Sequence, residues 1–237
     1  MKKIGAAPLM ALFVVLSSAC AFAQTFTLSN IQYWVGSGTN QTALVVAWND
    51  GITPDSLVFG YKWNMPGSGD APTVYDMMAA LQSADSDLRF YANPQFASPG
   101  DYALYSAFYN LTGGAGPTVG VPGNLGGTES GFAPAGDHYE EGWYYNGFWG
   151  ELLGDGNPYN GGAWDSNSPE GVSVDTLSND LWVGLSFSTD LTNFTTPNPA
   201  TPSAVFPVAI PEPSGLFLFP LGAMGLFACR RRQRRLA

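Results

Sequence analysis

Residues 42–48 read TALVVAW, an unbroken apolar run, and residues 56–63 follow as SLVFGYKW. An apolar run of this length, bounded by turn residues, is typical of a strand that is buried on both faces. The Asn-Asp-Gly sequence at residues 49–51 favours a turn, so the two runs are expected to pair as antiparallel neighbours. They predict a sheet at the centre of the fold.

One amphipathic helix is predicted over about residues 72–83. Val74, Met77, Met78 and Leu81 recur at the i, i+3, i+4 and i+7 spacing, which places them on one stripe of a helix. A Pro-Thr pair precedes the stripe, as is common at a helix N-terminus. We therefore expect the stripe to pack against the sheet.

Shorter runs predict further strands at residues 24–28, 31–35, 88–91, 102–109 and 181–187. Residues 111–137 are rich in Gly and Pro and are interpreted as a loop. The expected fold class is α+β, a mainly antiparallel sheet packed against one main helix. This fold is expected to lie between a signal peptide and a short C-terminal transmembrane segment.

The N-terminal residues 1–23 are typical of a secretory signal peptide. Two lysines precede an apolar run, and an Ala-Phe-Ala motif predicts cleavage between Ala23 and Gln24. Cys20 leaves a lipoprotein open as an alternative, although Ser17 stands where a lipobox usually has Leu. Either reading predicts an exported chain.

The C-terminal residues 211–237 combine three parts in a fixed order. A Pro-Glu-Pro-Ser motif at 211–214 is followed by an uncharged apolar segment at 215–229 and by five arginines within 230–235. Fifteen helical residues span roughly 22 Å, less than a hydrocarbon core of about 30 Å. The arginines are expected to stay cytoplasmic.

These three parts resemble the PEP-CTERM sorting signal of Gram-negative bacteria. The resemblance implies export by the Sec machinery, transient anchoring in the inner membrane and processing by an exosortase. The protein would then reach the cell surface or the extracellular matrix, often beside exopolysaccharide. A plain C-terminal membrane anchor is the alternative. The residues that this signal would use are Pro211, Glu212, Pro213, Ser214, Arg230, Arg231 and Arg232.

Between the two termini we expect one domain at residues 24–190 and a Thr/Pro-rich linker at 191–210. Residues 24–210 carry two Lys or Arg against 18 Asp or Glu, a difference of −16, and contain no cysteine. Such an acidic body argues against nucleic acid as a partner. The body also resembles exported bacterial domains of unassigned role, and faintly the transcobalamin-like β-grasp module. This resemblance rests on the order of three stretches, WVGSGTN, GWYYNGFW and WDSNSP.

No constellation in the body predicts catalysis. His138 is the sole histidine, in the polar sequence Asp-His-Tyr-Glu-Glu, and is interpreted as a solvated loop residue. Glu140, Glu141 and Glu151 could supply paired carboxylates for glycoside hydrolysis, but their spacing in three dimensions is not encoded locally. We therefore assign no catalytic residue and expect no enzymatic activity.

Two binding hypotheses remain open, one for calcium and one for carbohydrate. Apart from calcium, no cofactor is expected. Asp85, Asp87 and Asp155 lie in Asp/Asn/Gly clusters that could bind calcium, or that are present because turns favour these residues. A group of aromatic residues could form a platform for sugar rings, or could simply build the core. That group comprises Trp143, Tyr145, Trp149 and Trp164.

The sequence thus predicts an exported surface or matrix protein with a structural or adhesive role. A carbohydrate- or cofactor-binding module is the alternative, and a glycan hydrolase is a further one.

Overall fold

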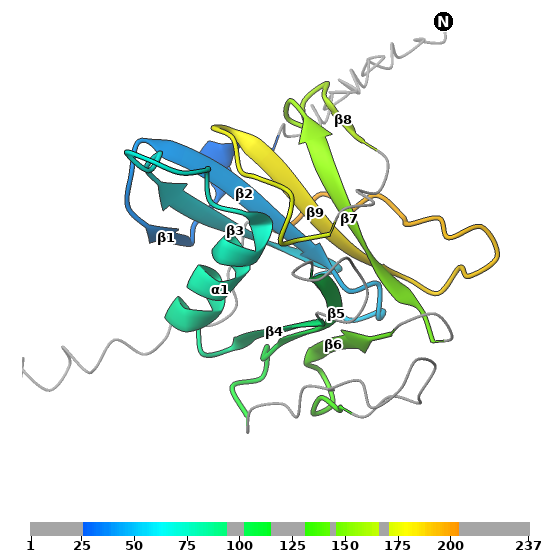
Figure 1. Ribbon diagram of the computed structural model, residues 1–237. Helices are drawn as coiled ribbons and strands as arrows, with labels where there is room; N and C mark the ends of the chain where they lie inside the picture. Colours follow the sequence, from blue (N-terminus) through cyan, green and yellow to red (C-terminus); the bar gives the residue numbers. More distant parts are fainter. Residues whose placement is uncertain (1–25, 94–101, 115–130, 143–145, 166–170, 204–237) are drawn as a thin grey trace, which may run out of the picture.

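The computed structural model describes residues 26–93, 102–114, 131–142, 146–165 and 171–203. Within them, two β-sheets and one α-helix form a fold that is α+β and mostly β (Figure 1). Five of the seven strand pairings are antiparallel, in agreement with the predicted fold class.

The larger sheet has six strands in the order β1-β3-β2-β9-β7-β8. Its strands are β1 (Trp34–Gly36), β2 (Asn40–Ala47), β3 (Ser56–Trp63), β7 (Phe148–Asp155), β8 (Ala163–Trp164) and β9 (Leu181–Ser188). The predicted antiparallel pairing of β2 with β3 is confirmed, with Asn40 opposite Trp63 and Ala47 opposite Ser56. On its other side β2 pairs with β9 in parallel, and β1 pairs with β3 in parallel.

Strand β2 is covered on both faces, as its apolar run predicted. Leu44 and Val46 point into the main core, which lies between the larger sheet, the helix and the second sheet. Ala43 and Val45 point into a second apolar cluster with Phe26. Because side chains alternate along a strand, a run without polar positions requires a cover on each face.

The helix α1 (Val74–Ala84) packs against β1, β3 and β4. Its four-residue stripe is buried, which confirms the prediction from the spacing. Thr73 caps the N-terminus, since its side chain accepts the Asp76 N–H while the Asp76 carboxylate accepts the Thr73 N–H. In Figure 1, α1 lies between β3 of the larger sheet and β4 of the smaller one.

The smaller sheet consists of β4 (Leu88–Asn93), β5 (Ala103–Tyr109) and β6 (His138–Glu141), all antiparallel. Ala107 and Tyr109 of β5 belong to the main core together with Trp48 at the end of β2. The Trp48 Nε1–H donates to the Ala107 carbonyl at 2.9 Å, a fully buried link between the two sheets.

The second apolar cluster is covered by chain segments from both ends of the body. Phe26 contacts Tyr159 and Trp182 edge-on. From the other end, the Ser203 N–H donates to the Ser56 carbonyl and the Ser56 hydroxyl donates to the Ala200 carbonyl. The segment expected to be a linker is therefore in contact with the sheet as far as residue 203.

Several local predictions differ from the structure. Residues 26–28 form no strand, because a 3-10 turn (Leu28–Asn30) follows Thr27, whose N–H donates to the Asn30 side chain at 2.8 Å. The strand expected at residues 31–35 is reduced to β1. Strand β6, within a stretch dominated by Gly and acidic residues, was not predicted at all, and neither were β7 and β8.

The described residues contain no helix that is long and apolar enough to cross a membrane. The expected signal peptide, the apolar segment 215–229 and the arginine cluster lie outside the described residues.

The capping arrangement of α1 gives a direct stability test. Replacing Thr73 by Ala should lower the free energy of unfolding by about 1 kcal/mol, because the Asp76 N–H loses its acceptor. Urea denaturation followed by circular dichroism measures the change. Thr73→Ser keeps the hydroxyl and should stay close to the parent; an equal loss for both variants would contradict the capping role.

Candidate functional site

A shallow pocket of about 330 Å³ lies where the loop after β2 meets the segment that leads into β6. Two carboxylates line it, and we call it the acidic pocket. Its lining residues are Asp50, Ile52, Gly131, Phe132, Ala133, Pro134, Ala135, Gly136, Asp137 and Tyr139.

Asp50 is positioned by the turn that ends β2. Asn49 adopts a positive φ of 55°, and its side-chain amide donates to the Phe187 carbonyl at 2.7 Å. Asn tolerates this left-handed conformation better than most residues, so the chain can reverse directly after Trp48. The Asp50 carboxylate then accepts the Ile52 N–H at 3.0 Å.

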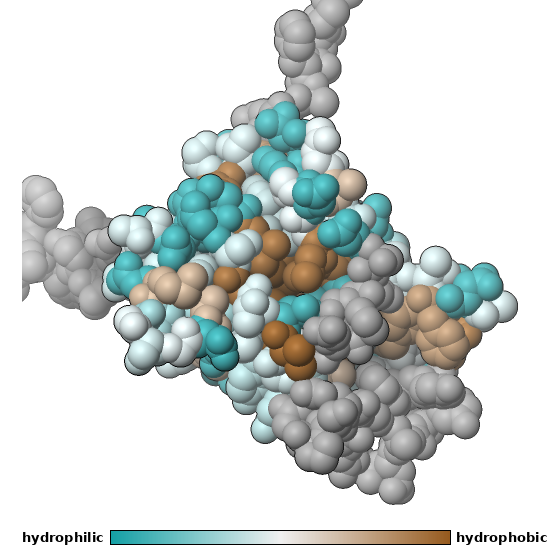
Figure 2. Space-filling model, turned by 45° about the horizontal axis from the view of Figure 1, so that its top comes forward, coloured by the Kyte–Doolittle hydropathy of each residue, from teal (hydrophilic) through white to brown (hydrophobic). Residues whose placement is uncertain are grey.

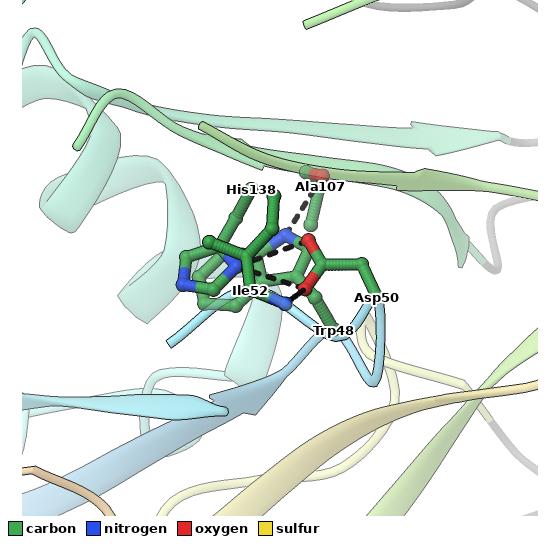
Figure 3. Close-up of polar contacts among 5 residues, drawn as sticks. All are labelled: Trp48, Asp50, Ile52, Ala107 and His138. Atoms are coloured by element: carbon green, nitrogen blue, oxygen red, sulfur yellow. Dashed lines mark hydrogen bonds and ion pairs between the residues drawn. The ribbon is translucent and has the colours of Figure 1, made fainter. Parts of the chain in front are cut away.

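Asp50 also holds the sole histidine of the chain (Figure 3). His138 Nδ1 lies 3.0 and 3.2 Å from the two Asp50 carboxylate oxygens. A carboxylate oxygen accepts, so Nδ1 carries the hydrogen. The imidazole is fully buried and stacks on Trp48 with 4.5 Å between ring centroids and 8° between planes. Its Nε2 has no hydrogen-bond partner in the described part of the chain.

The interpretation of His138 as a solvated loop residue is therefore wrong. It lies in β6 opposite Tyr109, on the face that points toward the main core. The partner that stabilises it there, Asp50, is 88 residues away in sequence. The sequence shows an Asn-Asp-Gly turn and a single histidine, but nothing in either stretch indicates that the two are in contact.

The residues beside His138 are also tied into the fold. Asp137 is 2% exposed, and one of its carboxylate oxygens accepts the Thr112 N–H at 2.8 Å. Its other oxygen is buried and has no partner among the described residues. Glu141 is fully buried and accepts hydrogen bonds from the Tyr139 hydroxyl and from the Gly131 N–H.

Another buried carboxyl lies on β7, away from the acidic pocket. Glu151 is 6% exposed, and neither of its carboxyl oxygens has a partner in the described residues. Burial, with a smaller contribution from the negative charge of Asp175, raises the pKa of Glu151 to about 8. Glu151 is therefore protonated at neutral pH. Trp149, two residues earlier on the same strand face, likewise has a buried Nε1 without a described partner.

The three aspartates considered for calcium do not come together. Asp85 and Asp87 form the turn between α1 and β4, where the Asp85 carboxylate accepts the Asp87 N–H at 2.9 Å. Burial raises the pKa of Asp85. Asp155 ends β7 in the other sheet. No group of three or more His, Cys, Asp or Glu able to hold a metal ion occurs among the described residues.

The four residues considered as a sugar platform are placed as follows. Trp143 and Tyr145 lie outside the described residues. Trp149 packs on Phe187 in the main core, whereas Trp164 packs on Tyr159 beside the second apolar cluster. The larger sheet separates these two tryptophans, so they cannot stack on one ligand ring.

The other residues that the sequence analysis assigned to sites lie near the two termini. The expected cleavage residues Ala23 and Gln24, the motif 211–214 and the arginines of 230–235 all lie outside the described residues.

Comparison with known proteins found no match: no protein-family model, no curated protein and no solved structure matches this chain.

The contact between Asp50 and His138 can be measured by a double-mutant cycle. Asp50→Ala, His138→Phe and the double variant should give a coupling energy of about 1–3 kcal/mol in urea denaturation, because each single change leaves the other side chain without this hydrogen bond. His138→Phe retains a flat ring on Trp48 and so isolates the hydrogen bond from the stacking. Additive single effects would show that the pair contributes no interaction of its own.

The raised pKa of Glu151 predicts a pH dependence of stability. Between its ordinary value of 4.5 and about 8, the folded state holds a proton that the unfolded state releases. Stability should therefore fall as pH rises through this window, by up to about 1.4 kcal/mol per pH unit from this group. Glu151→Gln should remove this part of the slope when unfolding is measured from pH 4.5 to 8. A variant with the same slope as the parent would contradict the assignment.

Proposed function

We propose that the protein is an exported bacterial surface or extracellular-matrix protein with a structural or adhesive, non-catalytic role. Residues 1–23 would direct export through the Sec machinery, and residues 211–237 would act as a PEP-CTERM-type sorting signal read by an exosortase. The observation that carries this proposal is the order of a Pro-Glu-Pro-Ser motif, an uncharged apolar segment and an arginine cluster. A short apolar segment followed by arginines suits transient anchoring.

The position of Ser203 indicates that the body would lie close to the proposed membrane anchor. Ser203 contacts the first residue of β3, so only residues 204–210 separate the described body from Pro211. Seven extended residues span at most about 25 Å. Before processing, the acidic body would therefore sit near the outer surface of the membrane.

The burial of the chemistry-bearing side chains supports a role without catalysis. His138 is enclosed between Trp48 and Asp50, and Glu141 and Glu151 are 0% and 6% exposed. Glycoside hydrolysis needs two carboxyl groups that flank a bound sugar. Glu141 and Glu151 are poorly placed to do so, which leaves the partly exposed Glu140 without a second carboxyl group from this set.

One surface feature favours an adhesive role. Figure 2 shows a face on which apolar side chains gather in the middle, with hydrophilic residues above and to the left of them. Apolar surface with a polar rim is common at interaction sites. A binding module remains the second candidate, favoured by the acidic pocket and by its lining residue Asp137, one of whose carboxylate oxygens is buried without a partner among the described residues.

The proposal is tested by intact-mass spectrometry of the protein from its native host, separated by cell fraction. A mass that ends within residues 211–214, in the surface fraction or the medium, is expected. A mass that extends to Ala237 in the membrane pellet would contradict the sorting signal and indicate a plain anchor.

The arginine cluster should be required for this sorting because its charge resists passage through the membrane. Replacing all five arginines of 230–235 by Ala should change the fractionation of the protein between membrane and surface, measured by immunoblotting. Replacement by Lys keeps the charge and serves as the matched control. Unchanged fractionation of the Ala variant would count against the role of the cluster.

A further inference from the structure

We infer that the acidic pocket binds the ammonium group of a linear aliphatic amine. This inference rests on the binding role named above as the second candidate, and it is independent of how the protein is sorted. It starts from the two carboxylates that line the pocket, Asp50 and Asp137.

The two carboxylates differ in the partners that stabilise their negative charge. Asp50 has a histidine and a backbone N–H, at 3.0 Å each. Asp137 has only the Thr112 N–H on one oxygen, and its other oxygen is buried without a partner in the described part of the chain. A buried carboxylate without a positive or fully hydrogen-bonded environment is costly. A cation bound beside Asp137 would lower that cost.

The body has no basic side chain left to supply this cation. Lys62 and Arg89 are the only Lys or Arg between residues 24 and 210. Arg89 donates to the carbonyl oxygens of Asp85 and Leu88, and the Lys62 ammonium lies 5.2 Å from the ring centroid of Trp34. A positively charged partner for Asp137 would therefore come from a ligand and not from a Lys or Arg of the body.

The remaining lining residues favour an organic amine over a metal ion. A hard cation such as calcium takes six to eight oxygen ligands, and the described residues hold no cluster of three metal-ligating side chains. The pocket instead offers apolar surface from Ile52 and Pro134, and the ring of Phe132 is 62% exposed. An aromatic face attracts an ammonium group, and apolar neighbours suit an alkyl stem.

Tyr139 makes the rim of the pocket more rigid. Its ring lines the pocket, and its hydroxyl donates to the buried Glu141 carboxylate, so it is fixed before a ligand arrives. A pre-positioned ring reduces the entropy lost on binding. The two carboxylates and the two aromatic rings of the pocket thus favour a ligand with a positively charged ammonium group on an apolar alkyl chain.

The test is isothermal titration of the purified full-length protein with cadaverine (1,5-diaminopentane) at about 0.15 M salt, where long-range attraction to an acidic protein is screened. We expect saturable binding with one ligand per chain. Diacetylated cadaverine, which has the same stem without charge, should not bind. Asp137→Asn should weaken binding by about ten-fold, and Phe132→Ala by about three-fold.

Asp155→Asn is the matched control, since it removes the same charge from an exposed position at the end of β7. Equal weakening by Asp155→Asn and Asp137→Asn would mean non-specific attraction and would overturn the proposal. Absence of saturable binding, tighter binding of glucosamine than of cadaverine, or displacement of cadaverine by equimolar calcium would overturn it as well. If Asp137→Asn does not fold, as judged by circular dichroism, Phe132→Ala decides, because that side chain is exposed and contributes little to the core.

Discussion

The fold depends on covering both faces of β2. This strand has hydrogen-bonded neighbours on each side, β3 and β9, and no polar side chain between Ala43 and Trp48. One face is covered by α1 and the smaller sheet, and the other by the segments that contain Phe26, Tyr159 and Pro199. The two ends of the body thus help to cover the core. Covering both faces of β2 also accounts for the large number of aromatic residues.

The acidic composition shapes how the interior is stabilised. With two basic side chains in the body, most buried carboxyl groups have no Lys or Arg beside them and use other partners. Asp50 uses His138, Asp85 uses the Asp87 N–H, and Glu141 uses Tyr139 and a backbone N–H. Glu151 has none of these partners and is held neutral instead. Cohesion of the body then comes from packing and hydrogen bonds, since the body contains no cysteine.

Local patterns in the sequence predicted the central elements well. Strands β2, β3 and β9 and helix α1 are marked by apolar runs or by helical spacing that need no knowledge of distant residues. Strand β6 and the burial of His138 were missed because their stabilising partners, Trp48 and Asp50, lie far away in sequence. Trp149 and Trp164 illustrate the same limit. Fifteen residues apart in an aromatic stretch, they lie on opposite faces of one sheet, and only the register of β7 with β8 and β9 decides this.

The strand order has a consequence for how the chain acquires its structure. β9, the last strand of the body, lies between β2 and β7 in the middle of the larger sheet. The larger sheet therefore cannot be completed until residue 188 is available. Before that point, its β1-β2-β3 and β7-β8 portions can form only as separate pieces. Such late, non-local closure slows folding. On the export route proposed above, which would thread an unfolded chain, slow closure would keep the larger sheet open until β9 is available.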